Sequence, residues 1–220
     1  MNIHIICPFY RKTLLPTLLK YLEPENIIWH PICDHIDIQA FDINHLPLWV
    51  QPIICAPFLA TDMCYRKIND FLDIGTIIDS DYYGFMGDDD MYEPGFFDTI
   101  RQQTARILVY SCYRGDTTPV IEEAEQHPSN PLIIRTIDDI QVGRVGLGMY
   151  IIKGEILRQT RFGNNHKWDD GYFAVNLKER WPGEIKILSD LFVFGNYFEP
   201  GRFTSKNNFI KNTWELPVIV

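Results

Sequence analysis

The sequence predicts an α/β fold with a mostly parallel central sheet and helices on both of its faces. Short apolar runs of strand length alternate with helical patterns through the first half of the chain, and this alternation is typical of parallel strands joined by crossover helices. A chain of 220 residues that is 46% hydrophobic can bury one sizeable core. We therefore expect one domain over residues 1–220, with a ligand site at the carboxyl ends of its strands.

The first half contains four predicted strands and two predicted helices. A strand is expected where a short apolar run stands between turn residues, and a helix where apolar residues recur at three- and four-residue spacing. Thr13 and Pro16 suit the cap and the first turn of the first helix. The predicted strands are 3–7, 27–29, 53–55 and 82–86, and the predicted helices are 14–22 and one that opens near Thr61 and Asp62 and carries Ile68 and Leu72.

The second half is more irregular. Pro94 suits the first turn of a helix that reaches about Gln103, and a further helix is expected to run to about Arg180. Polar residues and three prolines in 114–131 indicate a loop rather than a linker between domains. The predicted strands of this half are 107–112, 132–137 and 149–152.

Composition and motif content exclude several classes of protein. A net charge of -9 with 20 basic residues argues against nucleic acid as the main partner, because phosphate backbones need clustered Lys and Arg. No apolar run approaches the roughly 18 residues of a membrane span, and five cysteines without CxxC spacing favour free thiols in a cytoplasmic protein. No HExxH, Walker A or GxSxG motif is present, which removes the simplest zinc, P-loop and serine hydrolase hypotheses.

The most informative motif is Asp88-Asp89-Asp90, which follows the predicted strand 82–86. Three adjacent carboxylates repel one another and are best tolerated around a cation such as Mg²⁺ or Mn²⁺, which keeps coordination positions for substrate phosphates. The alternative is a solvated acidic turn that favours the N-terminus of the helix near Pro94. An EF-hand is excluded because Tyr92 and Glu93 stand where its loop needs an oxygen ligand and a glycine.

A second acidic pair, Asp169 and Asp170, opens the last predicted helix. Asp169 could simply be the N-cap. A cap uses one acid, so its neighbour could act as a general base, since the aromatic residues around it can raise a carboxylate pKa. Arg66 and Asn69 are three residues apart on one helix face. They could bind a phosphate or a sugar, or could be ordinary surface side chains, and the spacing decides nothing.

Four segments resemble the GT-A glycosyltransferases, particularly the family-2-like group with the SpsA-type nucleotide-diphospho-sugar transferase fold. They are residues 5–11 as the first strand and nucleoside loop, 65–69 as the helix that often reads ARN, 88–90 as the DxD motif, and 148–170 as the acceptor segment. The resemblance implies a Rossmann-like GT-A domain in which residues 1–112 form the nucleotide-sugar and metal-binding half and 113–220 the acceptor half.

The resemblance also implies an activity and roles for individual residues. The activity is a metal-dependent transfer of a sugar from a nucleoside-diphosphate sugar, with UDP as the expected nucleotide, to a hydroxyl acceptor. Asp90 would bind Mn²⁺ or Mg²⁺ directly. Asp88 would bind the metal through water or approach the ribose. Asp170 would be the general base of an inverting transfer, and Asp169 stands where the family usually has Glu. The nucleotide sugar would be bound by Pro8, Tyr10, Arg11, Asp34, Arg66, Asn69, Asp88 and Asp89.

Three departures from the family pattern keep an alternative open. No histidine follows His166 to provide the usual third metal ligand, so Asp190, Asn196, Glu199 or water would have to replace it. The segment around Asp34 is a poor copy of the usual acidic strand end, and the chain is short for the family. The alternative is a non-catalytic nucleotide-sugar or metal-binding protein. A nucleotidyltransferase would instead want a glycine- and lysine-rich loop where residues 8–11 read Pro-Phe-Tyr-Arg.

Overall fold

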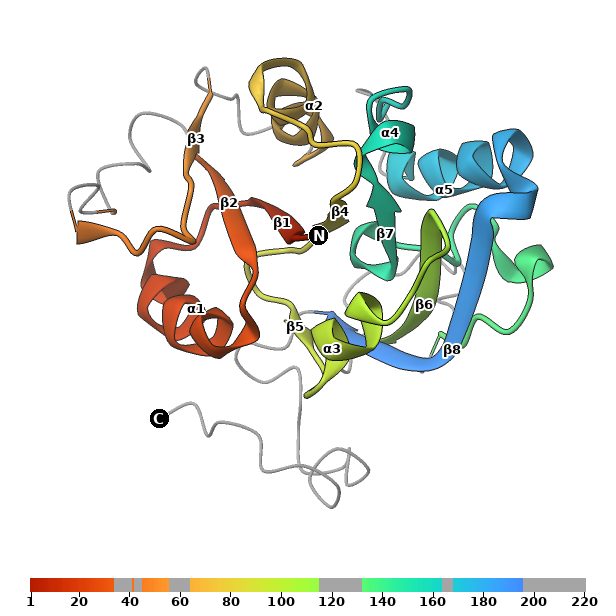
Figure 1. The fold of residues 1–220 in the computed structure, drawn as a ribbon, viewed down its shortest axis with the longest axis horizontal. Helices are drawn as coiled ribbons and strands as arrows, with labels where there is room; N and C mark the ends of the chain where they lie inside the picture. The colour runs from red at the N-terminus through yellow and green to blue at the C-terminus, as the bar shows by residue number, and fades with distance from the viewer. Residues whose placement is uncertain (34–40, 42–44, 56–63, 115–131, 164–167, 196–220) are drawn as a thin grey trace, which may run out of the picture.

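The computed structural model describes residues 1–33, 41, 45–55, 64–114, 132–163 and 168–195. These residues form an eight-stranded sheet in the order β3-β2-β1-β4-β7-β6-β8-β5, which curls strongly (Figure 1). Four of the neighbouring pairs are parallel and three are antiparallel. The predicted α/β class with a mostly parallel sheet is confirmed.

The first half of the chain folds as a parallel α/β unit, in agreement with the alternation of its sequence pattern. All four predicted strands and both predicted helices are present among the described residues. The predicted opening of the second helix near Thr61 lies outside them, and the first helix has Leu14 as its N-cap, without a side-chain cap from Thr13. The elements are β1 (Ile3–Pro8), α1 (Leu15–Leu22), β2 (Ile28–Cys33), β3 (Ile53–Ile54), α2 (Cys64–Ile74) and β4 (Tyr82–Phe85).

The second half adds an antiparallel strand beside β4 and then returns to parallel pairing. The chain folds so that β7 lies between β4 and β6, antiparallel to both, and β6 pairs in parallel with β8. The helix predicted at 169–180 is confirmed, and the one predicted from Pro94 is shorter than expected. The elements are β5 (Met91–Tyr92), α3 (Phe96–Arg101), β6 (Ile107–Arg114), β7 (Tyr150–Lys153), α4 (Gly154–Leu157), α5 (Asp169–Arg180) and β8 (Ile185–Gly195).

Two strands of the second half were missed, and one predicted strand is wrong. Both β5 and β8 lie where no strand was expected, and β8 shifts register against β6 between Tyr110 and Ser111, so its pattern is interrupted. The predicted strand 132–137 is only an isolated bridge between Leu132 and Cys112. Leu132 and Ile134 of this run are buried, but β6 already pairs with β7 on one edge and β8 on the other. Only the end of β6 beyond β7 is left for a bridge.

Aromatic contacts attach the helices to two different faces of the sheet. Tyr92 of β5 exchanges two hydrogen bonds with the hydroxyl of Tyr21 in α1 and packs against the first helical residue of α3. Phe162 packs between Tyr65 of α2, at a centroid distance of 5.6 Å, and Phe173 of α5, at 4.0 Å. Figure 1 shows α1 and α3 on one side of the strands and α2 and α5 on the other. The expectation of helices on both faces is confirmed.

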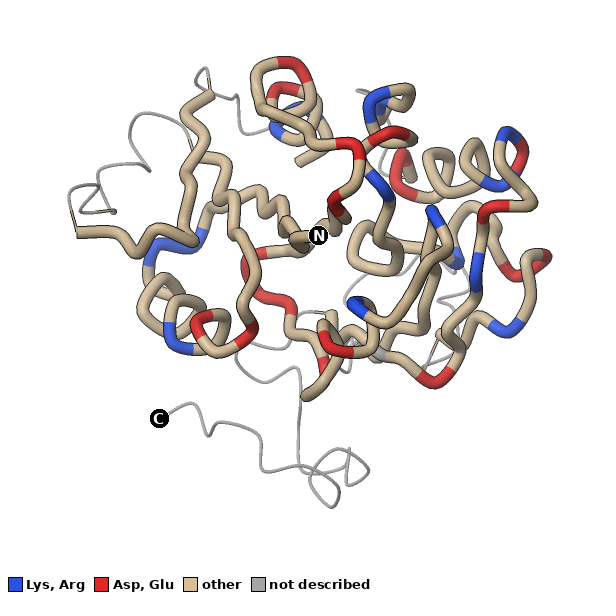
Figure 2. Tube along the Cα trace, viewed as in Figure 1, with Lys and Arg blue, Asp and Glu red and all other residues tan. Residues whose placement is uncertain are grey.

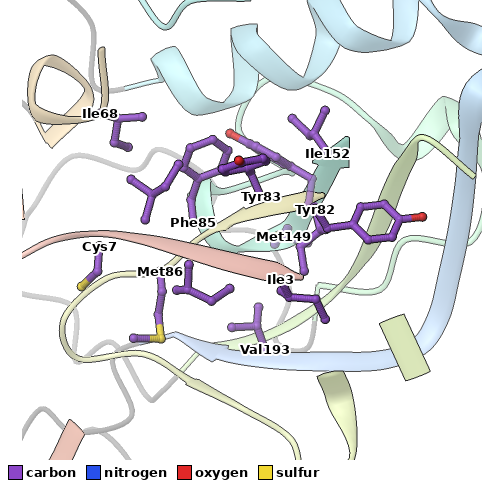
Figure 3. Packing of buried hydrophobic residues seen from close by; sticks show 14 of the residues in the cluster. Ile3, Cys7, Ile68, Tyr82, Tyr83, Phe85, Met86, Met149, Ile152 and Val193 are labelled. Atoms are coloured by element: carbon purple, nitrogen blue, oxygen red, sulfur yellow. The ribbon is translucent and has the colours of Figure 1, made fainter. Parts of the chain in front are cut away.

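The core is continuous from one side of the sheet to the other. Figure 3 shows Ile3 of β1 and Met86, just after β4, near Val193 of β8. A Cβ at Gly84, in the middle of β4, would lie 2.8 Å from Cγ1 of Ile151 in the neighbouring strand. Glycine at position 84 therefore leaves room for the side chain of Ile151 in the neighbouring strand.

Short 3₁₀ helices complete the described chain. They are η1 (Lys12–Leu14), η2 (Glu23–Glu25), η5 (Ile137–Asp139), η6 (Leu147–Met149) and η7 (Pro182–Glu184). Among them, η6 is the one next to the acidic turn, where it contributes to the candidate site. Figure 2 shows acidic and basic residues interspersed along the described helices and loops, rather than gathered into a basic face.

Candidate functional site

Asp88 joins the loop after β1 to the acidic turn after β4. Its Oδ2 accepts hydrogen bonds from the backbone N–H groups of Tyr10 (2.7 Å) and Arg11 (2.6 Å), and its Oδ1 forms an ion pair with the Arg11 guanidinium. The side chain is almost completely buried. A carboxylate that accepts several donors is held strongly in one orientation. Asp88 therefore has a structural role in the site, and its predicted contact with a metal or ribose stays a prediction.

Asp89 is a buried carboxylate with an acceptor that no hydrogen bond satisfies. Its Oδ2 lies 3.1 Å from Nη2 of Arg11, as an ion pair without hydrogen-bond geometry. Burial raises the pKa of Asp89 to about 6, repulsion from Asp90 adds to that increase, and the Arg11 charge opposes it. A buried acceptor of this kind is costly unless a donor or a cation completes it. Of the three aspartates, Asp89 has the environment that a bound cation would stabilise most clearly.

Asp90 is held by a tight turn with Gly87. The Gly87 N–H donates to Oδ2 of Asp90 at 2.7 Å, and the Asp90 N–H donates to the Gly87 carbonyl at 3.2 Å. A Cβ at Gly87 would lie 2.8 Å from Oδ2 of Asp90 and 3.0 Å from Oδ1 of Asp89. Glycine at this position is what allows both carboxylates to approach the backbone.

The triplet fits a divalent cation that also takes ligands from a bound nucleotide. In the described part of the chain, no three His, Cys, Asp or Glu side chains are arranged as a ready metal site. Mg²⁺ commonly binds one or two carboxylates and completes its coordination with water and substrate phosphates. Asp90 and Asp89, the latter through its unsatisfied oxygen, could supply these two carboxylate ligands. Of the suggested third ligands, Asp190 is exposed on β8, and 196 and 199 lie outside the described residues.

The η6 helix brings the second acidic pair beside the first. The Leu147 N–H donates to Oδ2 of Asp170 at 3.1 Å, and a Cβ at the next residue, Gly148, would lie 3.6 Å from Oδ2 of Asp90. Asp90 and Asp170 thus contact adjacent residues of one short segment. The charges of both carboxylates act on the thiol of Cys64. Burial first and then the charge of Asp170 raise the pKa of Cys64 to about 12, with a smaller effect of Asp90. The structure therefore brings both acidic motifs to the η6 segment.

Asp169 and Asp170 occupy the first turn of α5 and differ in their surroundings. The N-cap is Trp168, without a side-chain cap bond, so the alternative that Asp169 is the N-cap is wrong. Asp169 is buried, and a Cβ at Gly163 would lie 2.6 Å from its Oδ1. Asp170 is partly exposed, and the Tyr65 hydroxyl is hydrogen-bonded to it. Both charges also favour the helix N-terminus, so a base at Asp170 and helix stabilisation are compatible.

The two residues predicted on α2 differ from each other in exposure. Arg66 is exposed, as an arginine that meets a ligand can be. Asn69 is buried, donates to the Phe162 carbonyl (2.9 Å) and accepts from the Phe162 N–H (3.0 Å), which joins α2 to the segment before α5. Its contact with a nucleotide stays a prediction, and its amide has a structural role. Pro8 ends β1, and Asp34 lies outside the described residues.

Lys67 is a site residue that sequence reasoning missed. Its side chain is 1% exposed, its Nζ donates to the Phe9 carbonyl at 3.2 Å, and the same atom lies 3.7 Å from the centre of the Tyr10 ring. The sequence did carry a signal, because Lys67 stands on the apolar stripe of α2, four residues before Phe71. A lysine on a buried stripe needs a compensating partner. Here it supports the loop that Asp88 also holds.

The chain matches known proteins in fold rather than in sequence. No protein-family model and no curated protein sequence matches it. S. aureus TarS (1–349), a GT-A glycosyltransferase, is similar with a TM-score of 0.57 and 16% identity over 89% of this chain and 60% of TarS 1–349. The inositol-1-phosphate CTP transferase of T. maritima has a TM-score of 0.52 and 9% identity, covering 100% and 98% of the two chains. HddC from Yersinia pseudotuberculosis has a TM-score of 0.51 and 14% identity, covering 90% and 95%.

These similarities show the fold and no more. The chain has a nucleotide-sugar transferase-like fold, which occurs in a GT-A glycosyltransferase and in nucleotidyltransferases. It spans 60% of the length of TarS 1–349. Among the residues that the structure describes, we find no helix long and apolar enough to cross a membrane.

Proposed function

We propose that this chain is a glycosyltransferase that uses a divalent cation to bind a nucleoside-diphosphate sugar, with UDP as the nucleotide, and transfers the sugar to a hydroxyl acceptor. The observation that carries the proposal is that Asp170 and Asp90 lie against adjacent residues of η6, Leu147 and Gly148. One carboxylate pair for a cation and one separate carboxylate for proton transfer are then held at the same segment. A transfer from a diphosphate needs both functions close together.

The donor half of the site divides its work among three kinds of residue. Asp90 and Asp89 hold Mn²⁺ or Mg²⁺, and the cation, when bound, neutralises charge that develops on the diphosphate leaving group. Arg11 contributes a second positive charge to the diphosphate, and Arg66 is the further candidate on α2. Pro8, Tyr10 and Asp34 contact the nucleoside. Asp88 keeps the Tyr10 loop in place through the two backbone N–H groups that it accepts.

Asp170 is the proposed general base for the acceptor hydroxyl. The Leu147 N–H and the Tyr65 hydroxyl hold its carboxylate beside the η6 segment, and it is partly exposed. A base in a fixed orientation can remove the hydroxyl proton as the acceptor oxygen attacks the anomeric carbon. Attack by the acceptor on the face opposite the diphosphate gives inversion. Asp169, buried against Gly163, positions the start of α5 and does not meet the acceptor.

A nucleotidyltransferase is the second candidate, because the similarity to T. maritima CTP transferase covers both chains almost completely. Such an enzyme must bind a nucleoside triphosphate, and backbone N–H groups of a loop after the first strand are well suited to phosphates. In this chain the N–H groups of Tyr10 and Arg11 both donate to Asp88. A loop whose donors already bind a carboxylate is a poor triphosphate site. The glycosyltransferase is therefore the better supported of the two.

Calorimetric titration with UDP in the presence and absence of Mn²⁺ tests the donor site. We expect Mn²⁺-dependent UDP binding that Asp90→Asn abolishes. Asp98→Asn is the matched control, because Asp98 is an exposed aspartate of α3 in an ion pair with Arg101. The proposal is wrong if UDP binds equally with and without Mn²⁺, or if Asp90→Asn binds as the wild type does.

Turnover separates the transferase from the non-catalytic alternative. Donor hydrolysis and transfer are measured across a panel of nucleoside-diphosphate sugars, with Asp170→Asn and the exposed control Asp138→Asn beside the wild type. We expect Asp170→Asn to lose turnover by about a hundredfold or more and to keep UDP binding. Mn²⁺-dependent UDP binding without turnover on any donor would identify a binding protein. Turnover of a nucleoside triphosphate with release of diphosphate would identify the nucleotidyltransferase.

A further inference from the structure

Arg11 already provides a cation for the carboxylates of the acidic turn. Its Nη1 forms an ion pair with Oδ1 of Asp88, and its Nη2 lies 3.1 Å from Oδ2 of Asp89. The side chains of Asp88 and Asp89 are 2% and 7% exposed, whereas that of Arg11 is 46% exposed. The arginine thus reaches two buried carboxylates from the solvent side, where a ligand can also reach it.

The Arg11 guanidinium competes with a metal ion for Asp89. The unsatisfied Oδ2 of Asp89 is the acceptor that a divalent cation would use, and it is the same atom that faces Nη2 of Arg11. Two cations cannot both lie close to one carboxylate oxygen without strong repulsion. The contact has no hydrogen-bond geometry on the Asp89 side, and its loss leaves a buried carboxylate that the divalent cation then compensates. Asp88 retains the two backbone N–H groups whatever the side chain of Arg11 does.

We propose that Arg11 couples cation binding to nucleotide binding: in the free protein it occupies Asp89, and a diphosphate draws Nη2 away, which opens Asp89 to the divalent cation. This inference rests on the proposed function of the same site. A guanidinium binds a diphosphate with two parallel N–H donors, which compensates for the lost carboxylate. Because coupling between two ligands is reciprocal, the cation increases nucleotide affinity by the same factor. The metal and the nucleotide therefore bind as a pair.

Mn²⁺ binding measured directly tests this coupling without any enzymatic assay. The electron paramagnetic resonance signal of free Mn²⁺ is titrated against protein, with and without UDP. The proteins are the wild type, Arg11→Gln, Arg11→Lys and Lys12→Gln. Lys12 is exposed next to Arg11, so Lys12→Gln removes the same charge one position away and is the matched control. The backbone bonds to Asp88 remain in every variant, and circular dichroism checks that each is folded.

In the wild type we expect weak Mn²⁺ binding that UDP strengthens at least tenfold, within the usual range of coupling between ligands. Arg11→Gln should bind Mn²⁺ about tenfold more tightly without UDP and lose most of the strengthening by UDP. Arg11→Lys should fall between them, because an ammonium cannot reach two carboxylates as the guanidinium does. Lys12→Gln should behave as the wild type.

Three outcomes would overturn this inference. If Arg11→Gln binds Mn²⁺ no more tightly than the wild type, Arg11 does not compete for Asp89. If UDP leaves wild-type Mn²⁺ affinity unchanged while both ligands bind, the coupling is absent, and because coupling is reciprocal the Mn²⁺-dependent UDP binding of the proposed donor site fails with it. If neither the wild type nor any variant binds Mn²⁺ with UDP present, the proposed metal-dependent donor site fails as well, and with it this inference.

Discussion

Acidification is expected to destabilise the fold through His30, a buried histidine of β2 that lies far from the acidic turn. His30 is 6% exposed, its Nε2 lies 2.9 Å from Nδ1 of His4 in β1, and its ring packs against Phe71 of α2. Its Nδ1 lies 3.3 Å from the Gln51 carbonyl. The other nitrogen of His4 faces Asp81 at 3.3 Å. Protonation of His30 would place a positive charge in this buried row, directly beside His4.

The magnitude follows from the pKa of His30. Burial and the neighbouring His4 lower that pKa from 6.5 to about 4, against a small opposing effect of the Gln51 carbonyl. At pH values between these two pKa values, His30 binds a proton in the unfolded chain but not in the folded chain. The free energy of unfolding therefore falls as the pH falls. The shift is 6.5 minus 4, or about 2.5 pH units, which corresponds to about 3 kcal/mol. The loss is complete below about pH 4 and absent above about pH 7.

Urea unfolding of the wild type and His30→Gln between pH 7.5 and 4 measures this contribution. A glutamine amide can donate to His4 in place of Nε2 and does not titrate. Other groups also act in this range: burial lowers the pKa of His4, and the raised pKa of Asp89 has the opposite effect on stability. The difference between the two proteins removes the Asp89 contribution and leaves, of the His4 contribution, only the part that depends on His30.

We expect the stability advantage of the wild type over His30→Gln to fall by about 3 kcal/mol from pH 7.5 to pH 4. Replacement of the exposed His45 by Gln is the control and should leave the wild-type profile unchanged. A constant difference between wild type and His30→Gln over the whole range would refute the reasoning, because His30 would then titrate equally in the folded and unfolded chains.

Three further changes have expected outcomes. Gly87→Ala should weaken Mn²⁺-dependent UDP binding by about tenfold or more, because the new Cβ displaces Asp90. The far-ultraviolet circular dichroism spectrum should stay the same, and an unchanged UDP affinity by calorimetry would contradict this expectation. Asn69→Leu should lower the free energy of unfolding by about 2 to 4 kcal/mol, because two buried backbone groups of Phe162 lose their hydrogen-bond partner. A loss below about 0.5 kcal/mol in urea unfolding would argue against this role of Asn69. Lys67→Met should weaken UDP binding by calorimetry more than it lowers stability, because the apolar chain fills the site but no longer holds the loop after β1; equal UDP affinity would show that the loop needs no such support.

The first half of the fold followed from the sequence because its signals are local. Strands β1 and β4 are short, apolar and bounded by turn residues, and α1 and α2 have regular apolar spacing. Each of these features can be recognised within a window of about ten residues. The order of strand and helix then leaves few ways to connect them.

The second half could not be predicted as well because its strands depend on their partners. β8 follows β6 with a register shift, and β5 has only two residues, so neither has the unbroken alternation that marks a strand. The apolar run at 132–137 looks like a strand, but β7 and β8 pair with β6 on its two edges, and only the end of β6 beyond β7 is left for it. Burial without a partner for the backbone produced a bridge and a 3₁₀ turn instead.

The same distinction applies to the candidate site. The sequence by itself determined that three carboxylates follow a buried strand and that a second acidic pair opens a late helix, because side-chain chemistry and local pattern are written in consecutive residues. Only the tertiary structure decided how they are used. Asp88 accepts the N–H of Arg11, 77 positions away, and η6 places Asp90 and Asp170 beside one another. Such contacts depend on how distant strands pair, and a linear pattern does not specify which distant segments of the chain will meet.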